Sequence, residues 1–431
     1  MKRRRPFTDA PPTGDRRAES RPRGRGLHRR SFIALPCALA ATLLLAACGA
    51  SPPAPELPQS VYVWQRVWSP LLDASVAVTP QFVSSLRVLA LQAGPGQRSA
   101  EPEPNWDLLR KTGLPITLVV RIDGSSADLA AQSVPLQQAV LAQLNRWREH
   151  GVAAAGLEID YDCATAQLPG YAQWLAQLRP QLPPATSLSI TALPAWRDAA
   201  ALDAVLATVD LSVLQVHAVL NPTQGLFDAA LARRWVADWA RRSATRPFLV
   251  ALPAYGALLK LDEDGNVAAV ESEQRLPQRS AATRELTVDP REVAALVVEL
   301  EARRYPQLAG FVWFRLPDEG DKRTWTLRTL RAVIERTPLE ADLRITTMPV
   351  SGGSLNLIVN NYGSLDMPLP ARLQVHGDCD AGDGINGYAL VRDAGLHLQR
   401  AEATGVLRAG ASKPVGWLRC ADPAAVRVTP E

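Results

Sequence analysis

The chain lacks an excess of positive charge once its first 47 residues are set aside. The whole sequence has 47 basic and 43 acidic residues, and eleven of the basic and three of the acidic ones lie at positions 1–47. The rest of the chain therefore holds 36 basic and 40 acidic side chains, a net charge of about −4. Because nucleic-acid binding requires a basic surface, the sequence predicts no nucleic-acid partner.

Cysteine is scarce, with five in 431 residues. Cys379 and Cys420 both lie near the C-terminal end, where they are expected to form a disulfide in an oxidising compartment. Cys163 has no histidine close to it in the sequence, which disfavours a catalytic thiol, so a buried thiol is expected there.

A hydrophobic run long enough to span a membrane is also missing. Residues 32–47 are apolar but short, and a basic stretch precedes them, which is the pattern of an export signal rather than of a spanning helix. Residues 45–48 (L-A-A-C) resemble the lipobox of bacterial lipoproteins, which implies cleavage before Cys48 and lipid attachment to its thiol.

The lipobox resemblance implies a chain in the cell envelope, with the membrane as a partner through the anchor at Cys48. Gly49, rather than Asp, after the lipidated cysteine implies the outer membrane, facing the periplasm, in a Gram-negative host. Residues 29–33 (R-R-S-F-I) resemble a twin-arginine signal, and general secretion is the alternative route. Residues 1–48 are thus predicted to be a signal peptide and residues 49–59 a Pro-rich tether.

Residues 60–340 are predicted to form a (β/α)8 barrel of the α/β class. Eight β-rich segments alternate there with amphipathic helical ones, of which residues 136–150 and 291–304 are the clearest. The β-rich segments begin at Val61, Ser85, Ile116, Gly156, Ser187, Leu211, Phe248 and Gly310. Eight β-then-α units in about 280 residues match a TIM-like barrel. A doubly wound sheet is the alternative, but it often carries a Gly-rich phosphate loop, which this sequence lacks.

Two further segments have β character. A D-G-N sequence at residues 264–266 predicts a hairpin in the long connection after the seventh strand, on the face where barrels keep their active sites. This hairpin is expected to be either a lid or substrate wall, or a decorative insertion. Residues 341–431 hold short alternating segments separated by turn residues, which predict a small β-sandwich that a bridge between Cys379 and Cys420 would help to stabilise.

The segment G-L-E-I-D-Y-D at residues 156–162 carries three carboxylates at every second position, Glu158, Asp160 and Asp162. We call these three residues the acid row. Alternation along a strand puts them on one face, about 7 Å from one another. Each neighbouring pair then repels by about 2 kcal/mol at an effective dielectric of about 20. Since folding alone does not require such a row, it is a candidate functional site.

The acid row resembles the G-x-D-x-D-x-E strand of chitinase-type (family 18) glycoside hydrolases. Residues 252–256 (L-P-A-Y-G) and 310–319 (G-F-V-W-F-R-L-P-D-E) are similar to the seventh and eighth strands of that family, so the similarity spans roughly residues 60–338. The chain also resembles a bacterial lipoprotein family of unknown function that carries the same I-D-Y-D strand. The resemblance implies a glycan or polysaccharide as the partner.

The resemblance also implies a role for each acid: Asp162 is the general acid, Asp160 its partner and Glu158 a supporting inner acid. A like-charged neighbour and partial burial raise the pKa of a carboxyl group, which suits a proton donor. Among the expected binding residues, Trp313 resembles the Trp that floors the family's sugar site. The residues expected to contact substrate are Trp64, Arg121, Gln215, His217, Tyr255, Trp313 and Arg315.

The sequence departs from the family's pattern at three points. Ala155 replaces the family's first Asp, and Asp162 stands where the family has Glu, whose side chain is one methylene longer. Gln215 and His217 stand on the sixth strand in place of M-x-Y-D. A misplaced acid loses much of its rate advantage. The Tyr that holds the substrate's N-acetyl oxygen in the family is missing, so N-acetylglucosamine polymers are disfavoured. A different glycan, bound by a site rebuilt around Gln215 and His217, is expected.

Other roles for the acid row are open. Arg121 and Arg315 are placed to neutralise it as a buried charge network. A divalent cation needs more oxygen ligands than one strand supplies, so neither a metal nor another cofactor is expected. Two functions follow: a glycoside hydrolase with Asp162 as its acid, or a non-catalytic glycan-binding or scaffold lipoprotein with a degenerate barrel site.

Overall fold

The computed structural model describes most of the chain beyond the predicted tether. The described residues are 56–94, 100–124, 129, 133–217, 225–243, 245–271, 282–393, 395–401 and 405–431. The predicted signal peptide, Cys48 and most of the Pro-rich tether lie outside them. Within this described part, no helix has the length and hydrophobicity needed to cross a membrane.

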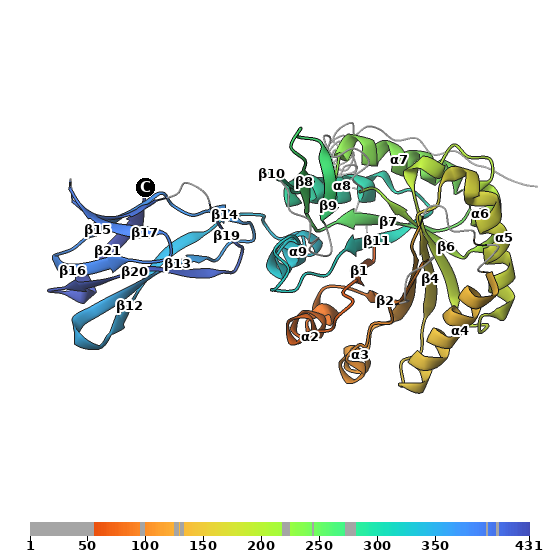
Figure 1. Ribbon diagram of the computed structural model, residues 1–431, viewed down its shortest axis with the longest axis horizontal. Coiled ribbons are helices and arrows are strands. Elements are labelled where there is room, and N and C mark those ends of the chain that lie inside the picture. The colour runs from red at the N-terminus through yellow and green to blue at the C-terminus, as the bar shows by residue number, and fades with distance from the viewer. Residues whose placement is uncertain are drawn as a thin grey trace, which may run out of the picture. The chain divides into compact units, whose positions relative to one another are not determined.

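Eight parallel strands form a closed barrel, in which each strand pairs with the next along the chain (Figure 1). They are β1 (Gln59–Val63), β2 (Ser85–Ala93), β3 (Ile116–Ile122), β4 (Gly156–Tyr161), β5 (Ser187–Ala192), β6 (Leu211–Gln215), β7 (Phe248–Pro253) and β11 (Leu308–Phe314). The last strand, β11, pairs with both β7 and β1 and so closes the barrel. The predicted fold class and all eight predicted strands are confirmed.

Helices cover the outer face of the barrel. They are α2 (Pro70–Ala77), α3 (Trp106–Thr112), α4 (Ser133–Glu149), α5 (Leu168–Leu178), α6 (Leu202–Thr208), α7 (Ala229–Arg242), α8 (Pro290–Arg303) and α9 (Leu327–Ile334). Trp147 of α4 and Trp239 of α7 are fully buried in the large core between helices and strands. The Trp239 indole also donates a hydrogen bond of 3.1 Å to Ser212 of β6. A second, smaller apolar cluster, which includes Leu89, Val119 and Val312 of the barrel strands, is separate from this core.

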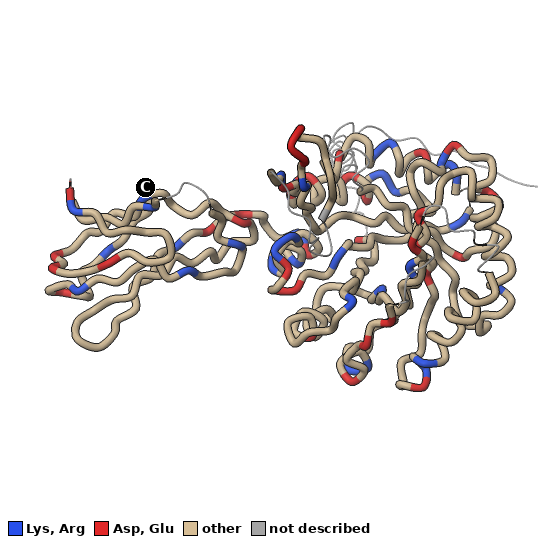
Figure 2. The backbone as a smooth tube through the Cα atoms, viewed as in Figure 1, with Lys and Arg blue, Asp and Glu red and all other residues tan. Residues whose placement is uncertain are grey.

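The C-terminal region consists of antiparallel strands with a core of their own. One sheet has the order β12-β13-β20-β16, a second has the order β17-β18-β15-β21, and β14 pairs with β19. Their bounds are β12 (Leu343–Val350), β13 (Ser354–Asn361), β14 (Met367–Pro368), β15 (Arg372–His376), β16 (Cys379–Gly384), β17 (Tyr388–Arg392), β18 (Leu396–Arg400), β19 (Val406–Leu407), β20 (Ser412–Cys420) and β21 (Arg427–Pro430). The predicted disulfide between Cys379 and Cys420 is confirmed and joins β16 to β20. Acidic and basic residues are interspersed along this region and along the barrel (Figure 2).

The long connection after β7 is a three-stranded antiparallel sheet. It contains β8 (Ala257–Leu261), β9 (Val267–Glu271) and β10 (Ala282–Leu286), in the order β10-β8-β9. The predicted hairpin is confirmed as β8 and β9, whereas β10 was not predicted. At its turn, a carboxylate oxygen of Asp262 accepts a hydrogen bond of 2.8 Å from the Asn266 backbone.

The start of this insertion is fixed to the loop after β11. The backbone N–H of Gly256 donates to the carbonyl of Arg323, and Tyr255 pairs with Thr324 as an isolated β-bridge. A Cβ atom at position 256 would lie 2.6 Å from the carbonyl oxygen of Leu286. The glycine of the L-P-A-Y-G segment is therefore required by close backbone approach.

Candidate functional site

The acid row lies on the inner face of the barrel. In the register of the sheet, Glu158 is opposite Ser189 of β5, and Asp160 is opposite Arg121 of β3. Asp162 follows the last residue of β4, at the carboxyl end of the strand. The alternation expected from the sequence thus puts the three acids at three successive depths, with Asp162 nearest the mouth.

The deepest acid belongs to a sealed network that we call the inner cluster, made of Tyr62, Arg87, Glu158 and Ser189. The Glu158 side chain is fully buried and forms an ion pair with Arg87. It also accepts hydrogen bonds from the Tyr62 hydroxyl at 2.6 Å and from the Ser189 hydroxyl at 3.3 Å. Burial, followed by the nearby charge of Glu158, raises the pKa of Tyr62 well above its ordinary value. Every polar partner of Glu158 is therefore internal.

The other two acids share one guanidinium group in what we call the outer cluster, made of Arg121, Asp160, Asp162, Thr191 and Gln215. Nη1 of Arg121 donates to Oδ2 of Asp160 and to Oδ2 of Asp162, at 2.8 Å in both cases. Thr191 donates a hydrogen bond of 2.6 Å to the other oxygen of Asp160. Burial raises the pKa of Asp160 to about 6, in spite of Arg121, which lowers it, and with a further rise from Asp162.

Asp162 is the member of the acid row that solvent reaches, since 36% of its side chain is exposed. Its second oxygen accepts a hydrogen bond of 3.3 Å from the side-chain amide of Gln215. The acids of the row therefore differ in access, because Glu158 and Asp160 are both buried.

A cavity of about 290 Å³, which we call the barrel cavity, opens above the outer cluster. It is lined by Tyr62, Trp64, Arg66, Arg121, Asp123, Asp160, Asp162, Thr191, Gln215, His217, Ala251, Tyr255 and Phe314. Tyr62, Trp64 and Phe314 pack edge to face, with ring centres 5.2 to 5.7 Å apart. The cavity thus combines aromatic surface with an Asp–Arg network at the carboxyl ends of the strands.

His217 contributes an unpaired polar atom to the barrel cavity. Its Nδ1 lies 3.3 Å from the Tyr255 hydroxyl, and its ring stacks on Phe314 with centres 5.5 Å apart. Burial lowers the pKa of His217 to about 4, so the ring is neutral near pH 7. Among the described residues, its Nε2 is buried without a hydrogen-bond partner. A buried polar atom of this kind favours a polar ligand in the cavity.

The structure brings most of the predicted site residues together but places Trp313 elsewhere. Trp313 is fully buried, and its indole donates a hydrogen bond of 2.8 Å to Gln59. Because neighbouring side chains of β11 face opposite ways, Phe314 lies in the barrel cavity instead. Phe314, and not the predicted Trp313, is thus the aromatic side chain of β11 that lines the cavity.

The two arginines expected to neutralise the acid row have different partners. Arg121 does pair with Asp160 and Asp162, whereas Arg315 forms its ion pair with Asp321, outside the row. Arg87, which pairs with Glu158, was not predicted. The signal for it was a single charged residue within the apolar run of residues 86–91.

Cys163 is buried, as expected from the sequence. Burial raises the pKa of its thiol to about 12, so the thiolate that would act as a nucleophile is not formed near neutral pH.

In the described ranges, His, Cys, Asp and Glu side chains form no group of three or more that could hold a metal ion.

Comparison with known proteins links both parts of the chain to domains of unknown function. Residues 112–319 match the domain of unknown function DUF3142, and residues 345–421 match a second one, DUF8456. Among curated proteins, none matches the chain in sequence.

Solved structures similar to this chain include barrels of low sequence identity. The spore cortex-lytic enzyme SleL of Bacillus cereus is 17% identical over 61% of this chain and 72% of its own, with a TM-score of 0.46. A chitinase of Chromobacterium violaceum is 16% identical over 65% and 98% of the two chains, also with a TM-score of 0.46. A chitinase-like lectin of tamarind is 12% identical over 65% and 99%, with a TM-score of 0.42. The residues that match DUF3142 thus lie within the closed eight-stranded barrel.

Proposed function

We propose that this protein is an envelope-anchored, glycoside-hydrolase-like lipoprotein whose barrel cavity binds a polysaccharide, and that binding rather than cleavage is its principal function. The observation that carries this proposal is the position of Arg121. One nitrogen of its guanidinium lies 2.8 Å from an oxygen of Asp160 and 2.8 Å from an oxygen of Asp162.

The lining of the barrel cavity suits a sugar ring. Saccharides present an apolar face, which stacks on aromatic rings, and a rim of hydroxyl groups, which need donors and acceptors. Phe314 and Trp64 supply the aromatic surface, and Asp162 and Gln215 supply acceptor and donor groups. The buried Nε2 of His217 adds a hydrogen-bonding atom that a sugar hydroxyl would satisfy.

The same geometry opposes acid catalysis. In the hydrolases that the acid row resembles, the last two acids act as a pair, and the outer one donates a proton to the glycosidic oxygen. Here the oxygens through which Asp160 and Asp162 would share a proton both accept hydrogen bonds from Arg121. Asp162 is therefore arranged as an acceptor for sugar hydroxyls.

Cleavage is the second candidate function, and the exposure of Asp162 favours it. Its side chain reaches the open barrel cavity, and the pKa of the adjacent Asp160 is raised to about 6 by burial. Hydrolysis would require Arg121 to leave Asp162 when substrate binds. Asp123 offers it an alternative partner, because Nε of Arg121 already lies 3.2 Å from a carboxylate oxygen of Asp123.

The test is to titrate the purified full-length protein with bacterial and plant oligosaccharides while assaying reducing ends. We expect saturable binding without turnover, and at least a tenfold loss of affinity in Phe314→Ala and in Gln215→Ala. Val298→Ala, an exposed site on α8, is the control and should bind like the wild type. Release of reducing ends that disappears in Asp162→Asn would instead establish the hydrolase, and failure to bind any saccharide would reject both candidates.

We also propose that Cys48 carries a lipid that holds the protein at the outer membrane, facing the periplasm. The support is the L-A-A-C sequence and the Pro-rich segment that follows it. Cys48→Ala should move the protein from the membrane fraction to the soluble fraction of the cell envelope. Cys37→Ala, within the predicted signal, should leave it in the membrane fraction, and equal behaviour of the two variants would contradict the anchor.

A further inference from the structure

The barrel cavity holds more negative than positive charge. Its acids are Asp123, Asp160 and Asp162, and its basic residues are Arg66 and Arg121. The pKa of Asp160, raised by burial to about 6, still leaves that carboxyl ionised at pH 7, whereas the ring of His217 is neutral there. With each arginine counted against one aspartate, the charge of one carboxylate in the cavity is left uncompensated.

Arg121 contacts all three aspartates of the barrel cavity. Its Nη1 lies 2.8 Å from Asp160 and 2.8 Å from Asp162, and its Nε lies 3.2 Å from Asp123. One guanidinium group is therefore shared by three carboxylates. Two of these acids, Asp123 and Asp162, are partly exposed, so their oxygens can be reached by a group that enters the cavity.

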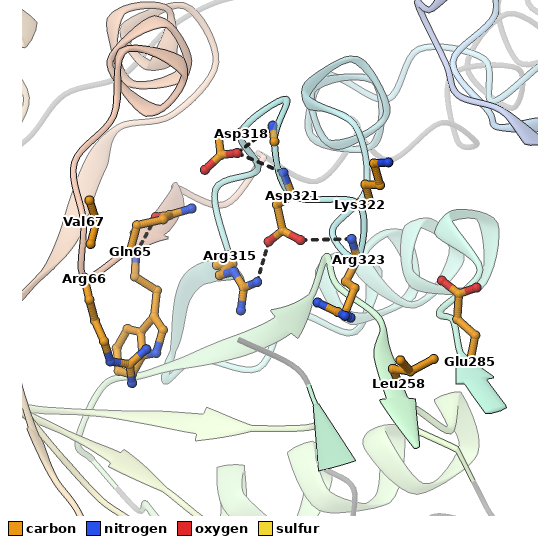
Figure 3. A pocket seen from close by; sticks show the side chains of 12 residues that line it. Gln65, Arg66, Val67, Leu258, Glu285, Arg315, Asp318, Asp321, Lys322 and Arg323 are labelled. Atoms are coloured by element: carbon orange, nitrogen blue, oxygen red, sulfur yellow. Dashed lines mark hydrogen bonds and ion pairs between the residues drawn. The ribbon is translucent and has the colours of Figure 1, made fainter. Parts of the chain in front are cut away.

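A second cavity, of about 540 Å³, adjoins the barrel cavity and shares Trp64 and Arg66 with it. We call it the rim cavity. Its own charged residues are three of each sign, namely Arg315, Lys322 and Arg323, and Glu285, Asp318 and Asp321. Figure 3 shows two of them, Arg315 and Asp321, joined as an ion pair. The rim cavity therefore adds no net charge, and the two cavities together keep the excess of one carboxylate.

His217 adds an acceptor that is independent of the aspartates. Its Nε2 is buried without a hydrogen-bond partner among the described residues. The neutral ring carries one proton, and with that proton on Nδ1, 3.3 Å from the Tyr255 hydroxyl, Nε2 presents a lone pair. An ammonium group donates three hydrogen bonds and accepts none, so it complements this nitrogen as well as the carboxylates. Aromatic rings, which also line the cavity, attract a cation too.

Building on the proposed function, we propose that the barrel cavity takes a sugar ring with a free amino group, so that the ligand is a polysaccharide of amino sugars without acetyl groups. The ammonium group pairs with Asp162, the most exposed acid of the row, and supplies the positive charge that the cavity lacks. An acetylated amine is neutral and donates one hydrogen bond instead of three, so it would leave the excess negative charge uncompensated.

Matched pairs of oligosaccharides test this inference by calorimetric titration of the full-length protein at pH 6.5. The probes are oligomers of 4-linked glucosamine, 6-linked glucosamine and 4-linked galactosamine, each beside a portion of the same sample whose amines have been acetylated. The two members of a pair share linkage and length, so they differ only in the charge and size of the nitrogen substituent. We expect at least one free-amine oligomer to bind at least fivefold more tightly than its acetylated form.

Variants of the aspartates locate the amino group. Asp162→Asn should reduce the preference for the free amine to less than twofold, because it removes the exposed negative charge and keeps the shape of the side chain. Asp123→Asn, a second partly exposed acid of the cavity, should also weaken the preference. Glu149→Gln, an exposed acid at the end of α4, is the control and should keep the full preference. Thermal midpoints show whether each variant keeps its fold.

The possible outcomes separate this inference from the proposed function. Equal or tighter binding of the acetylated member in every pair would overturn the amino-sugar inference and leave the proposed function standing. A preference for the free amine that persists in Asp162→Asn would overturn the pairing of the ammonium group with Asp162. Binding of no saccharide at all would overturn the proposed function together with this inference.

Discussion

The acids of the inner and outer clusters come from one segment of the chain, residues 158–162, and each cluster pairs carboxylates with an arginine, yet their environments differ. Glu158 is fully enclosed, with Arg87, Tyr62 and Ser189 as its partners. Asp162, four residues later, borders an open cavity with 36% of its side chain exposed. Each cluster contains one arginine, which balances the single acid of the inner cluster but faces two acids in the outer cluster. The clusters therefore differ in charge balance as well as in depth in the barrel.

This difference indicates that a row of acids need not be one functional unit. At the depth of Glu158, the barrel is filled by side chains, and a charge there is tolerated because its partners surround it. At the mouth, the same spacing leaves carboxylate oxygens that a ligand can reach. The inner cluster is therefore expected to support the fold, and the outer cluster to serve binding.

The largest expected effect comes from breaking the inner cluster. Arg87→Met leaves the Glu158 carboxylate buried without its cation, and removing one partner of a buried pair costs about 3–5 kcal/mol. Urea unfolding should show this loss. The double variant Arg87→Met with Glu158→Gln should recover much of the stability, because the uncompensated charge is gone. A single variant as stable as the wild type would mean that Glu158 is hydrated rather than sealed.

The matching change in the outer cluster is Arg121→Gln. Because the Arg121 side chain is 24% exposed and borders a cavity, the loss of stability should be smaller, about 1–3 kcal/mol. Saccharide affinity should fall at least tenfold, since Asp160 and Asp162 would repel and shift. The comparison between the clusters would fail if Arg87→Met and Arg121→Gln had equal effects on stability.

The stability of the protein should depend on pH through two buried groups that line the barrel cavity, Asp160 and His217. The pKa of Asp160 is raised to about 6, so its contribution to the unfolding free energy is full below pH 4 and is lost as the pH rises through 6. The pKa of His217 is lowered to about 4, so its contribution is present above pH 6.5 and is lost as the pH falls through 4. In the wild type these two dependences oppose each other.

Removing either Asp160 or His217 should therefore leave the pH dependence of stability that comes from the other group. Between pH 4 and 6.5, stability should rise more steeply with pH in Asp160→Asn than in the wild type, and less steeply in His217→Gln. The expected change is on the order of 2 kcal/mol over this range. Urea unfolding midpoints recorded at pH 4 and at pH 6.5 measure this change in stability. Parallel pH profiles in all three proteins would show that neither group has a shifted pKa.

The smallest expected effect concerns the hydroxyl of Tyr255, which lies 3.3 Å from Nδ1 of His217. Tyr255→Phe removes a single hydrogen-bonding group and keeps the ring, so stability should fall by about 0.5–1.5 kcal/mol. Saccharide affinity should fall only a few-fold, because Phe314 and Asp162 remain. A loss as large as that of Arg121→Gln would place Tyr255 in direct contact with the ligand.

Sequence reasoning predicted the barrel because its signals are local. Alternating apolar segments and amphipathic helices identified all eight strands, and the spacing of the acid row fixed its common face. The choice between Trp313 and Phe314 depends on a register of one residue, which flips a side chain to the other face of the strand. The sequence places both at a strand end and does not show which one faces inward.

The partner of Glu158 was harder to predict than Arg121, because it lies across the barrel and not on a neighbouring strand. Arg87 is on β2 and Glu158 on β4, so they meet across the interior with β3 between their strands. The backbone contact of Gly256 with Arg323 likewise joins segments that are far apart in sequence. Contacts between distant segments produce no characteristic residue spacing, so a single sequence does not reveal either of them.

The attachment of the insertion has a consequence for how this part of the chain can change during evolution. The contacts that hold it to the loop after β11 are main-chain ones, from Gly256 to Arg323, between Tyr255 and Thr324, and from Trp325 to Ala254 at 2.9 Å. Backbone hydrogen bonds persist when most side chains are exchanged. Side chains of β8 and β10 can therefore be exchanged while the main-chain contacts that attach the insertion to the barrel are kept.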